Sequence, residues 1–338
     1  MRLDVLYDRP GPSALPAAQV GYQAWQFHHL QRFADVRFWG DGRGDAVVCW
    51  DERSLLLDPR VRAQRCDGLF VFVCHDWWCR PLALLRELRR RERVLLVLRH
   101  DAARRFFDLV APDLPKVVLR PGVETSVFHP HGGEKTVDVL LAGSETPDYP
   151  LRRRLNALVR AHARRRGWSV LDLTGPGLLS GPPGTQREYA PALASAKLSP
   201  TGANRGGSAG ASLVLQYLDH SPARAALDDG FYGLARPDVA VLDLDTAGVT
   251  PRYLESLASR TLLLADLPSG ESEAWYADKM AAVSAELSDA ELLDEIDRRL
   301  GDDAAREALV EHAYAETLRT ETAERKAEEL VEVIDARL

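Results

Sequence analysis

The segment D-V-L-L-A-G-S-E-T-P-D-Y-P-L-R-R-R-L, residues 138–155, carries the pattern that decides the fold. Its apolar run predicts a buried strand that ends at Gly143-Ser144, and Pro150 suits the first position of a following helix. Arginines fill the first turn of this helix at 152–154, where the helix dipole disfavours cations unless an anion is bound. We therefore expect at least one of them to contact a phosphate; the alternative is three solvated arginines on a basic helix.

The same alternation of short apolar runs and helical patterns covers nearly the whole chain. Continuous Val/Leu/Phe runs between helices predict parallel sheets that are covered on both faces, and hence an α/β fold. The predicted strands are 3–7, 36–39, 46–50, 69–74, 94–98, 116–119, 137–142, 169–173, 197–199 and 261–265. The predicted helices are 17–33, 81–91, 101–110, 151–166, 189–196, 252–259, 289–300, 304–318 and 321–338.

One stretch resists this pattern. Residues 202–210 hold four glycines, residues 212–234 look helical without strand partners, and residues 239–244 fit an additional strand. A linker, a lid and an acceptor-binding insertion are all open interpretations of this stretch.

The length of 338 residues predicts two domains, because one hydrophobic core stops growing at about 250–300 residues. Residues 121–137 hold two prolines and three glycines and interrupt the alternation, as an interdomain segment does. We predict two Rossmann-like domains with a closing helix: an N-terminal domain at 1–125, a linker at 126–136, a C-terminal domain at 137–320, and a helix at 321–338 that packs back on the N-terminal domain.

Charge is distributed unevenly along the chain, whose formal net charge is −7. Residues 1–270 carry 35 basic and 30 acidic side chains, whereas residues 271–338 carry 8 and 20. Arginine supplies 38 of the 43 basic residues. A GC-rich coding sequence explains such a bias, but arginine also suits a bidentate grip on phosphate.

Membrane insertion and secretion are not expected. No apolar stretch approaches the roughly 18 residues of a membrane span, and the first residues resemble a strand rather than a signal peptide. The four cysteines, Cys49, Cys66, Cys74 and Cys79, form no C-x-x-C pair. We therefore predict no transmembrane segment, a cytoplasmic location, reduced thiols and no metal site.

The predicted strands also nominate functional residues, because ligands bind beyond the carboxyl ends of strands in open α/β sheets. In the first half these positions are His75, His100 and Asp101, and in the second half they include the Gly143-Ser144 pair and Thr201. The sequence contains neither G-x-G-x-x-G nor a Walker A motif nor G-x-S-x-G. Dinucleotide, P-loop and nucleophile-elbow chemistry are therefore not supported.

A second informative segment is T-P-R-Y-L-E-S-L-A-S-R-T-L-L-L-A-D, residues 250–266. It resembles the TPR-(F/Y)-x-E-x-(L/A)-A-S-G-x-L-L-L-x-D stretch of GT-B glycosyltransferases, and most closely of the spore-maturation CgeB-like group, alongside the family 1 and family 4 C-terminal domains. Residues 120–130, R-P-G-V-E-T-S-V-F-H-P, look like the interdomain P-x-G-V-D-x-x-x-F-x-P of that group. Residues 137–152 are similar to its V-D-V-x-x-x-G-S…Y-P-x-R, and residues 189–202 match more weakly.

The resemblance implies a GT-B fold, with two Rossmann-like domains facing across a cleft, an acceptor-side N-terminal domain and a nucleotide-sugar-binding C-terminal domain. It implies that Glu255 holds the ribose hydroxyls, a task suited to a carboxylate. The remaining donor-site residues that we carry over, together with the strand-end Thr201, are Gly143, Ser144 and Arg152 near the diphosphate, Thr250 and Arg252 at a helix start, and Tyr253 as an aromatic neighbour or a packing residue.

Two positions depart from the family pattern. The usual glycine after A-S is Arg260, and the position eight residues ahead of Glu255, where many retaining relatives carry a second glutamate, is Ala247. Thr250 is also predicted to cap the helix that Pro251 begins.

A catalytic base is expected from the first half of the chain if the reaction inverts the sugar configuration. The candidates are His100, Asp101 and His75, with the pair His100-Asp101 preferred because the resembling family often has His and Asp there. For Asp101 the alternative is a helix N-cap. Trp77-Trp78 could stack on a sugar or pack in a core.

The function that these residues imply is hexosyl transfer from a nucleotide-diphosphate sugar, such as a UDP sugar, to an unidentified small molecule, glycan or modified base. Cations and hydrogen-bond donors stabilise the leaving diphosphate in this fold class, so no cofactor and no metal are expected. Two alternatives stay open. Arg260 and Ala247 favour a non-catalytic nucleotide- or sugar-binding module, and arginine clusters at 89–93 and 164–166 favour a base-modifying glycosyltransferase that acts on nucleic acid.

Overall fold

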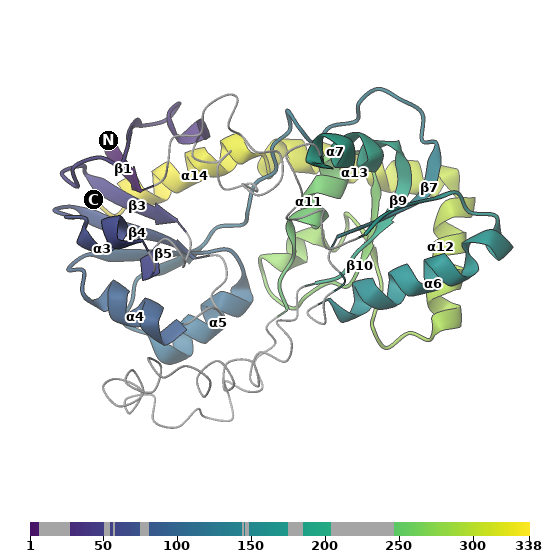
Figure 1. The fold of residues 1–338 in the computed structure, drawn as a ribbon, viewed down its shortest axis with the longest axis horizontal. Coiled ribbons are helices and arrows are strands. Elements are labelled where there is room, and N and C mark those ends of the chain that lie inside the picture. The colour runs from purple at the N-terminus through teal and green to yellow at the C-terminus, as the bar shows by residue number, and fades with distance from the viewer. Residues whose placement is uncertain are drawn as a thin grey trace.

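The structure, a computed structural model, describes residues 1–6, 28–50, 55–56, 58–74, 81–143, 145, 149–174, 185–203 and 247–338. Figure 1 shows two α/β domains side by side, each built on a parallel sheet with helices on both faces. The α/β prediction is thereby confirmed. The predicted helix at 212–234, the strand at 239–244, most of the helix at 17–33 and most of the glycine-rich stretch lie outside the described residues.

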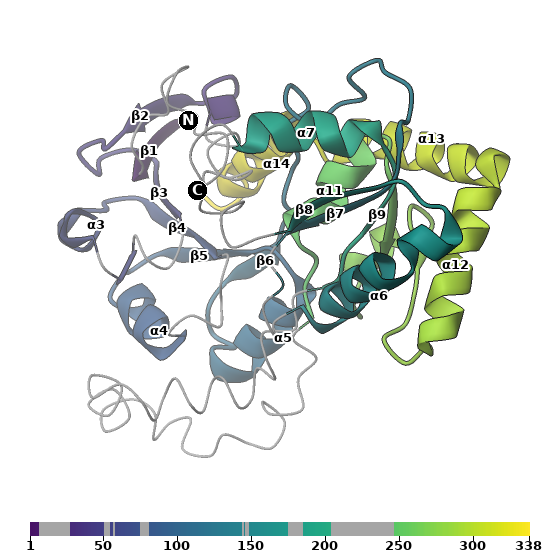
Figure 2. The ribbon, with the colours of Figure 1, turned by 45° about the vertical axis from the view of Figure 1, so that its right-hand side comes forward.

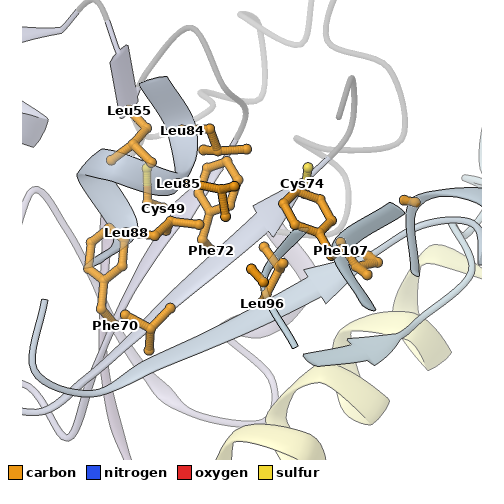
Figure 3. Close-up of a cluster of buried hydrophobic side chains, with 14 of the residues drawn as sticks. Cys49, Leu55, Phe70, Phe72, Cys74, Leu84, Leu85, Leu88, Leu96 and Phe107 are labelled. Carbon is orange, nitrogen blue, oxygen red and sulfur yellow. The ribbon is translucent and has the colours of Figure 1, made fainter. Parts of the chain in front are cut away.

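The N-terminal sheet has six parallel strands in the order β2-β1-β3-β4-β5-β6. Their bounds are β1 Arg2–Leu6, β2 Asp35–Phe38, β3 Ala46–Trp50, β4 Leu69–Cys74, β5 Val94–Leu98 and β6 Lys116–Val118. On one face, Phe70, Phe72 and Leu96 pack against α3 (Pro59–Ala63), α4 (Pro81–Arg89) and α5 (Asp101–Val110), as Figure 3 shows in part. Both faces of these strands are covered, which explains their uninterrupted apolar runs.

The C-terminal sheet has five parallel strands in the order β11-β10-β9-β7-β8. Their bounds are β7 Val137–Gly143, β8 Val170–Thr174, β9 Ala196–Pro200, β10 Leu262–Ala265 and β11 Ala281–Ala282. One face packs against α7 (Thr185–Ser195) and α11 (Pro251–Ala258), and the other against α6 (Pro150–Arg166) and α12 (Asp289–Gly301). Figure 2 shows α6 and α7 on opposite sides of this sheet.

Both sheets have the same topology, which fixes where a ligand can bind. In each sheet the second strand in the chain pairs with one side of the first strand, and the third strand pairs with its other side. These strands are β1, β2 and β3 in the N-terminal sheet and β7, β8 and β9 in the C-terminal sheet. In the C-terminal sheet the two connections leave in opposite directions from the carboxyl ends of β7 and β9. Such a topological switch point opens a crevice between the two strand ends.

The two last helices connect the domains. Helix α13 (Asp303–Thr320) packs in the C-terminal domain, and α14 (Ala323–Asp335) crosses to the N-terminal sheet (Figure 1). Ala327, Leu330 and Ile334 of α14 are buried in one cluster with side chains of β1, β3, β4 and β5. At the crossing, the Arg120 guanidinium lies 2.7 Å from the fully buried carboxylate of Glu321.

The differences from the predicted elements are local. The sequence pattern missed α3, β11 and the 3₁₀-helix η2 (Glu273–Tyr276), each of five residues or fewer, and α7 begins before the predicted helix. Elements this short have too few residues to show a period. No helix in the described part of the chain has the length and apolarity that crossing a bilayer needs.

Replacing Leu330 with alanine tests the packing of α14. Because Leu330 is fully buried against the N-terminal sheet, we expect Leu330→Ala to lower the free energy of unfolding by about 2–5 kcal/mol. Urea unfolding followed by circular dichroism measures the change. Leu318→Ala on α13, whose side chain is 41% exposed, is the control and should cost less than about 0.5 kcal/mol. Equal losses in the two variants would contradict the packing.

Candidate functional site

The candidate site lies at the switch point of the C-terminal sheet. Gly143 is the last residue of β7, and Thr201 and Gly202 follow β9 directly. Helix α6 begins at Pro150 after β7, so its N-terminal end, with free backbone N–H groups, faces this crevice. Gly143, Thr201 and Arg152 were predicted from the sequence, and the structure brings them together.

Gly143 occupies a conformation and a space that only glycine fits. Its φ is +99°, a region that side-chain-bearing residues rarely adopt. A Cβ atom there would lie 2.6 Å from Nε of Arg252 and 3.1 Å from Nη1 of Arg152. Two guanidinium groups, one from each of two helices, therefore converge on the backbone at the end of β7.

Arg152 is buried, with 2% of its surface exposed. Its Nε donates to Oγ1 of Thr201 at 3.0 Å, and its guanidinium carbon lies 3.9 Å from the centre of the Tyr149 ring. Burial lowers the pKa of Arg152 to about 10, and the positive charge of Arg252 acts in the same direction. Two like charges held this close favour an anion between or beside them.

Arg252 comes from the first turn of α11. Its guanidinium carbon lies 4.7 Å from the centre of the Tyr189 ring, and its buried Nη1 has no hydrogen-bond partner among the described residues. Thr250 stands at the N-cap position of α11, but its hydroxyl does not cap the helix. The predicted N-cap position is therefore confirmed, but the side-chain hydrogen bond of a capping threonine is not formed. The buried Thr250 hydroxyl likewise has no partner within the described ranges.

Glu255 lies one turn further along α11. The Tyr189 hydroxyl donates to its Oε2 at 3.2 Å. Burial raises the pKa of Glu255 above its usual value, while the Arg252 cation opposes the shift. Tyr189 thus contacts both Arg252 and Glu255. It was not predicted as a site residue, although it lies in segment 189–202, which resembles the family weakly.

Tyr253 points the other way, into the core. Its ring is fully buried, and its hydroxyl donates to the backbone carbonyl of Asp266 at 2.7 Å. Asp266 in turn accepts a 2.7 Å hydrogen bond from the backbone N–H of Ala203. Of the two roles considered for Tyr253, the geometry supports packing. The residue fixes the end of β10 relative to the segment after β9.

Only one arginine of the α6 triplet turns into the crevice. Arg153 is exposed, and Arg154 binds Asp289 and the backbone carbonyls of Ala285 and Leu287. The helical period of 3.6 residues separates these faces. Arg152 is therefore the arginine of this triplet that faces the crevice.

The arginine clusters that favoured a nucleic-acid partner are largely engaged within the protein. Arg89, Arg90 and Arg166 pair with acidic side chains. Arg91 and Arg93 donate to backbone carbonyls.

His100 and Asp101 follow β5 of the N-terminal domain. His100, not Asp101, occupies the N-cap position of α5, so the capping alternative for Asp101 is wrong. The Asp101 carboxylate instead accepts a 2.6 Å hydrogen bond from the backbone N–H of Ser272 in the C-terminal domain. That hydrogen bond lowers the pKa of Asp101 although burial opposes it.

His100 is also in contact with the C-terminal domain. A Cβ atom on Gly248 would lie 3.4 Å from its ring, and its Nδ1 lies 3.9 Å from Oε1 of Glu273. Burial, with the Arg99 cation, lowers the pKa of His100 to about 4, so this imidazole is neutral at ordinary pH. Glu273 was not predicted, because a single glutamate in a short loop gives no pattern.

Some predicted residues cannot be placed. Ser144, His75 and the Trp77-Trp78 pair lie outside the described residues. Within the part of the chain that is described, no three His, Cys, Asp or Glu side chains are grouped closely enough to hold a metal ion.

The two departures from the family pattern have different consequences. Arg260 adopts φ +52°, the left-handed conformation that glycine would take, so the turn before β10 keeps its shape. Its guanidinium lies 2.8 Å from Glu311 and over the Tyr314 ring. Ala247 is buried and supplies no carboxylate.

Comparison with known proteins gives the fold. The sequence matches no protein-family model and no curated protein sequence. Solved structures of glycosyltransferases match along nearly its whole length. Sucrose-phosphate synthase from Thermosynechococcus elongatus aligns with a TM-score of 0.59 at 10% identity, covering 99% of this chain and 98% of that one.

Two further structures agree. AviGT4, a glycosyltransferase involved in avilamycin A biosynthesis, aligns with a TM-score of 0.55 at 13% identity over 100% and 98% of the two chains. A DNA-modifying β-glucosyltransferase, solved with and without uridine diphosphoglucose, aligns with a TM-score of 0.54 at 11% identity over 99% of both. The chain therefore has the GT-B fold of glycosyltransferases, as the resemblance predicted.

Replacing Gly143 tests the convergence of the two arginines. We expect Gly143→Ala to lower the free energy of unfolding by about 1–3 kcal/mol, because φ is unfavourable and a Cβ atom would displace a guanidinium. The control is Gly167→Ala, at φ +73° with no atom within 4 Å of the new Cβ, which should cost about 1 kcal/mol. Urea unfolding compares them, and a smaller loss for Gly143→Ala would contradict the crowding.

Proposed function

We propose that the protein transfers a sugar from a nucleotide-diphosphate sugar, and that the donor diphosphate binds at Gly143 between Arg152 and Arg252. The observation that carries the proposal is the convergence of these two guanidinium groups at the switch point of the C-terminal sheet. A diphosphate supplies the negative charge that this arrangement favours, and its oxygens match the planar donors of arginine.

The proposed chemistry is stabilisation of a leaving group. When the bond between the anomeric carbon and the diphosphate oxygen breaks, negative charge develops on the diphosphate. We propose that Arg152, Arg252 and the N-terminal ends of α6 and α11 balance this charge without a bound metal. Both helices begin with a proline, which suits the first helical position because an N–H there would have no partner within the helix.

The proposed nucleotide contact is the carboxylate of Glu255 with the ribose hydroxyls. Tyr189 contacts both side chains, because its ring packs against the Arg252 guanidinium and its hydroxyl donates to Glu255. We therefore propose that a ribose attached to the diphosphate lies within reach of Glu255. A carboxylate accepts two hydroxyl hydrogen bonds at once. The base, the sugar and the acceptor, whether a small molecule, a glycan or a modified base, are not specified by these contacts.

Charge-removing variants test the diphosphate site. We expect Arg252→Gln and Arg152→Gln to weaken UDP binding about 10- to 150-fold, since a charge-assisted hydrogen bond contributes about 1.5–3 kcal/mol. Isothermal titration with UDP, GDP and dTDP measures the constants. Arg153→Gln, an exposed neighbour, should leave them unchanged within about twofold. Absent binding of every nucleotide by the wild type would contradict the proposal.

Deoxynucleotides test the ribose contact. The wild type should bind UDP about 5- to 10-fold more tightly than 2′-deoxy-UDP, because the latter lacks one hydroxyl that Glu255 would accept from. In Glu255→Ala this preference should disappear while the dependence on Arg252 persists. A preference that survives the substitution would place the ribose elsewhere.

A further inference from the structure

Two carboxyl groups from different domains meet at Gly270. Asp101 begins α5 in the N-terminal domain, and Glu273 begins η2 in the C-terminal domain. A Cβ atom on Gly270 would lie 2.2 Å from Oε2 of Glu273 and 2.9 Å from Oδ2 of Asp101. Ser272 joins the two groups: its backbone N–H donates to Asp101 at 2.6 Å, and its hydroxyl donates to Glu273 at 2.7 Å.

Both carboxyl groups are nearly excluded from water. Asp101 is 8% exposed and Glu273 is 1% exposed. Oε1 of Glu273 is buried and has no hydrogen-bond partner among the residues described, and the same holds for the nearby Nδ1 of His100. Two ionised carboxylates at such a buried point repel each other, so the pair retains one proton more readily than an isolated carboxylate does.

We propose that Asp101 and Glu273 act together as the proton acceptor of the transfer reaction, a carboxyl dyad that is complete only when the two domains are in contact. The proposal rests on the glycosyl transfer proposed above and deepens it. The acceptor oxygen forms a bond with the anomeric carbon while the bond from that carbon to the diphosphate oxygen breaks. The diphosphate leaves with the electron pair, and the acceptor's proton goes to the dyad. When water is the acceptor, the same step hydrolyses the donor.

The dyad suits this task better than Asp101 alone. Hydrogen bonding by Ser272 holds the pKa of Asp101 below its usual value, so Asp101 alone is a weak base. Burial and the Asp101 carboxylate raise the pKa of Glu273 to about 7. A base works best when its pKa is near the working pH. Once both groups are ionised, the pair takes up a proton with an affinity that belongs to the pair.

The charged groups around the dyad come from both domains. His100 and Arg105 face it from the N-terminal domain, with Arg99 acting on His100, and Arg105 also donates to the backbone carbonyl of Ser269 at 3.2 Å. Glu271 lies on the same turn as Glu273 and is exposed. His100 is neutral across the relevant range, so the pH dependence near neutrality is expected to follow the dyad.

The pH dependence of donor hydrolysis tests the role of the dyad. With UDP-glucose, GDP-mannose and dTDP-glucose as probes, wild-type kcat/KM should rise with pH through about 7, because the reaction needs the doubly ionised pair. In Glu273→Gln the midpoint of this rise in kcat/KM should move down by roughly 2–3 pH units, toward the pKa range of a single aspartate. Asp101→Asn should lower the rate about 10²- to 10⁴-fold. The control Glu271→Gln should keep the wild-type profile.

An infrared titration tests the dyad without any nucleotide. Between pH 5 and 9, the wild type should show a protonated carboxyl band that is lost near pH 7, and Glu273→Gln should lack this band while Glu271→Gln retains it. Absence of that band in the wild type would overturn the dyad. A band with no shift of the midpoint of the rise in kcat/KM in Glu273→Gln would overturn its role as acceptor. Failure of the wild type to hydrolyse any donor would instead contradict the proposed function, and the base role with it.

Discussion

Repulsion between two like charges is the constraint around which the C-terminal domain is organised. Arg152 and Arg252 are held against the same glycine, within a few ångströms of each other's guanidinium groups, in a place from which water is largely excluded. Burial, and after it the positive charge of Arg252, lower the pKa of Arg152, so holding the two cations here costs free energy. The surrounding packing must therefore hold the arginines where relaxation would separate them.

The means of holding them are visible in the fold. Each arginine projects from the first turn of a helix whose other face is buried in the core, so neither helix can rotate. Tyr149 and Tyr189 offer ring faces to the two cations, which attract positive charge without neutralising it. Tyr253 and Asp266 then fix the strand end opposite. The site is positioned by apolar cores on both sides of the sheet.

Much of the architecture was readable from the sequence, because buried parallel strands leave uninterrupted apolar runs. LFVFVC, VLLVL and VDVLLA predicted β4, β5 and β7 to within one residue. The arginine triplet predicted a ligand-facing cation but could not show which member faces the crevice, since that depends on how α6 rotates to bury Leu151 and Leu155.

The residue contacts between the two domains were beyond prediction. Glu273 lies on a four-residue helix with no period to read, and it meets Asp101, far earlier in the chain, only because the domains pack together. Arg260 illustrates another limit: the sequence has arginine where the resembling family has glycine, yet the backbone keeps the left-handed turn and the side chain contacts α13. Local patterns report local structure, and these features arise from tertiary contacts.

The crossing of α14 also constrains the order of events at the ribosome. The N-terminal sheet is complete when β6 has emerged, but Leu330 and Ile334 join the cluster on one of its faces only after the C-terminal domain has been translated. That cluster is therefore finished late in synthesis. Docking of α14 then completes the first domain last, and it makes the integrity of each domain depend on that of the other.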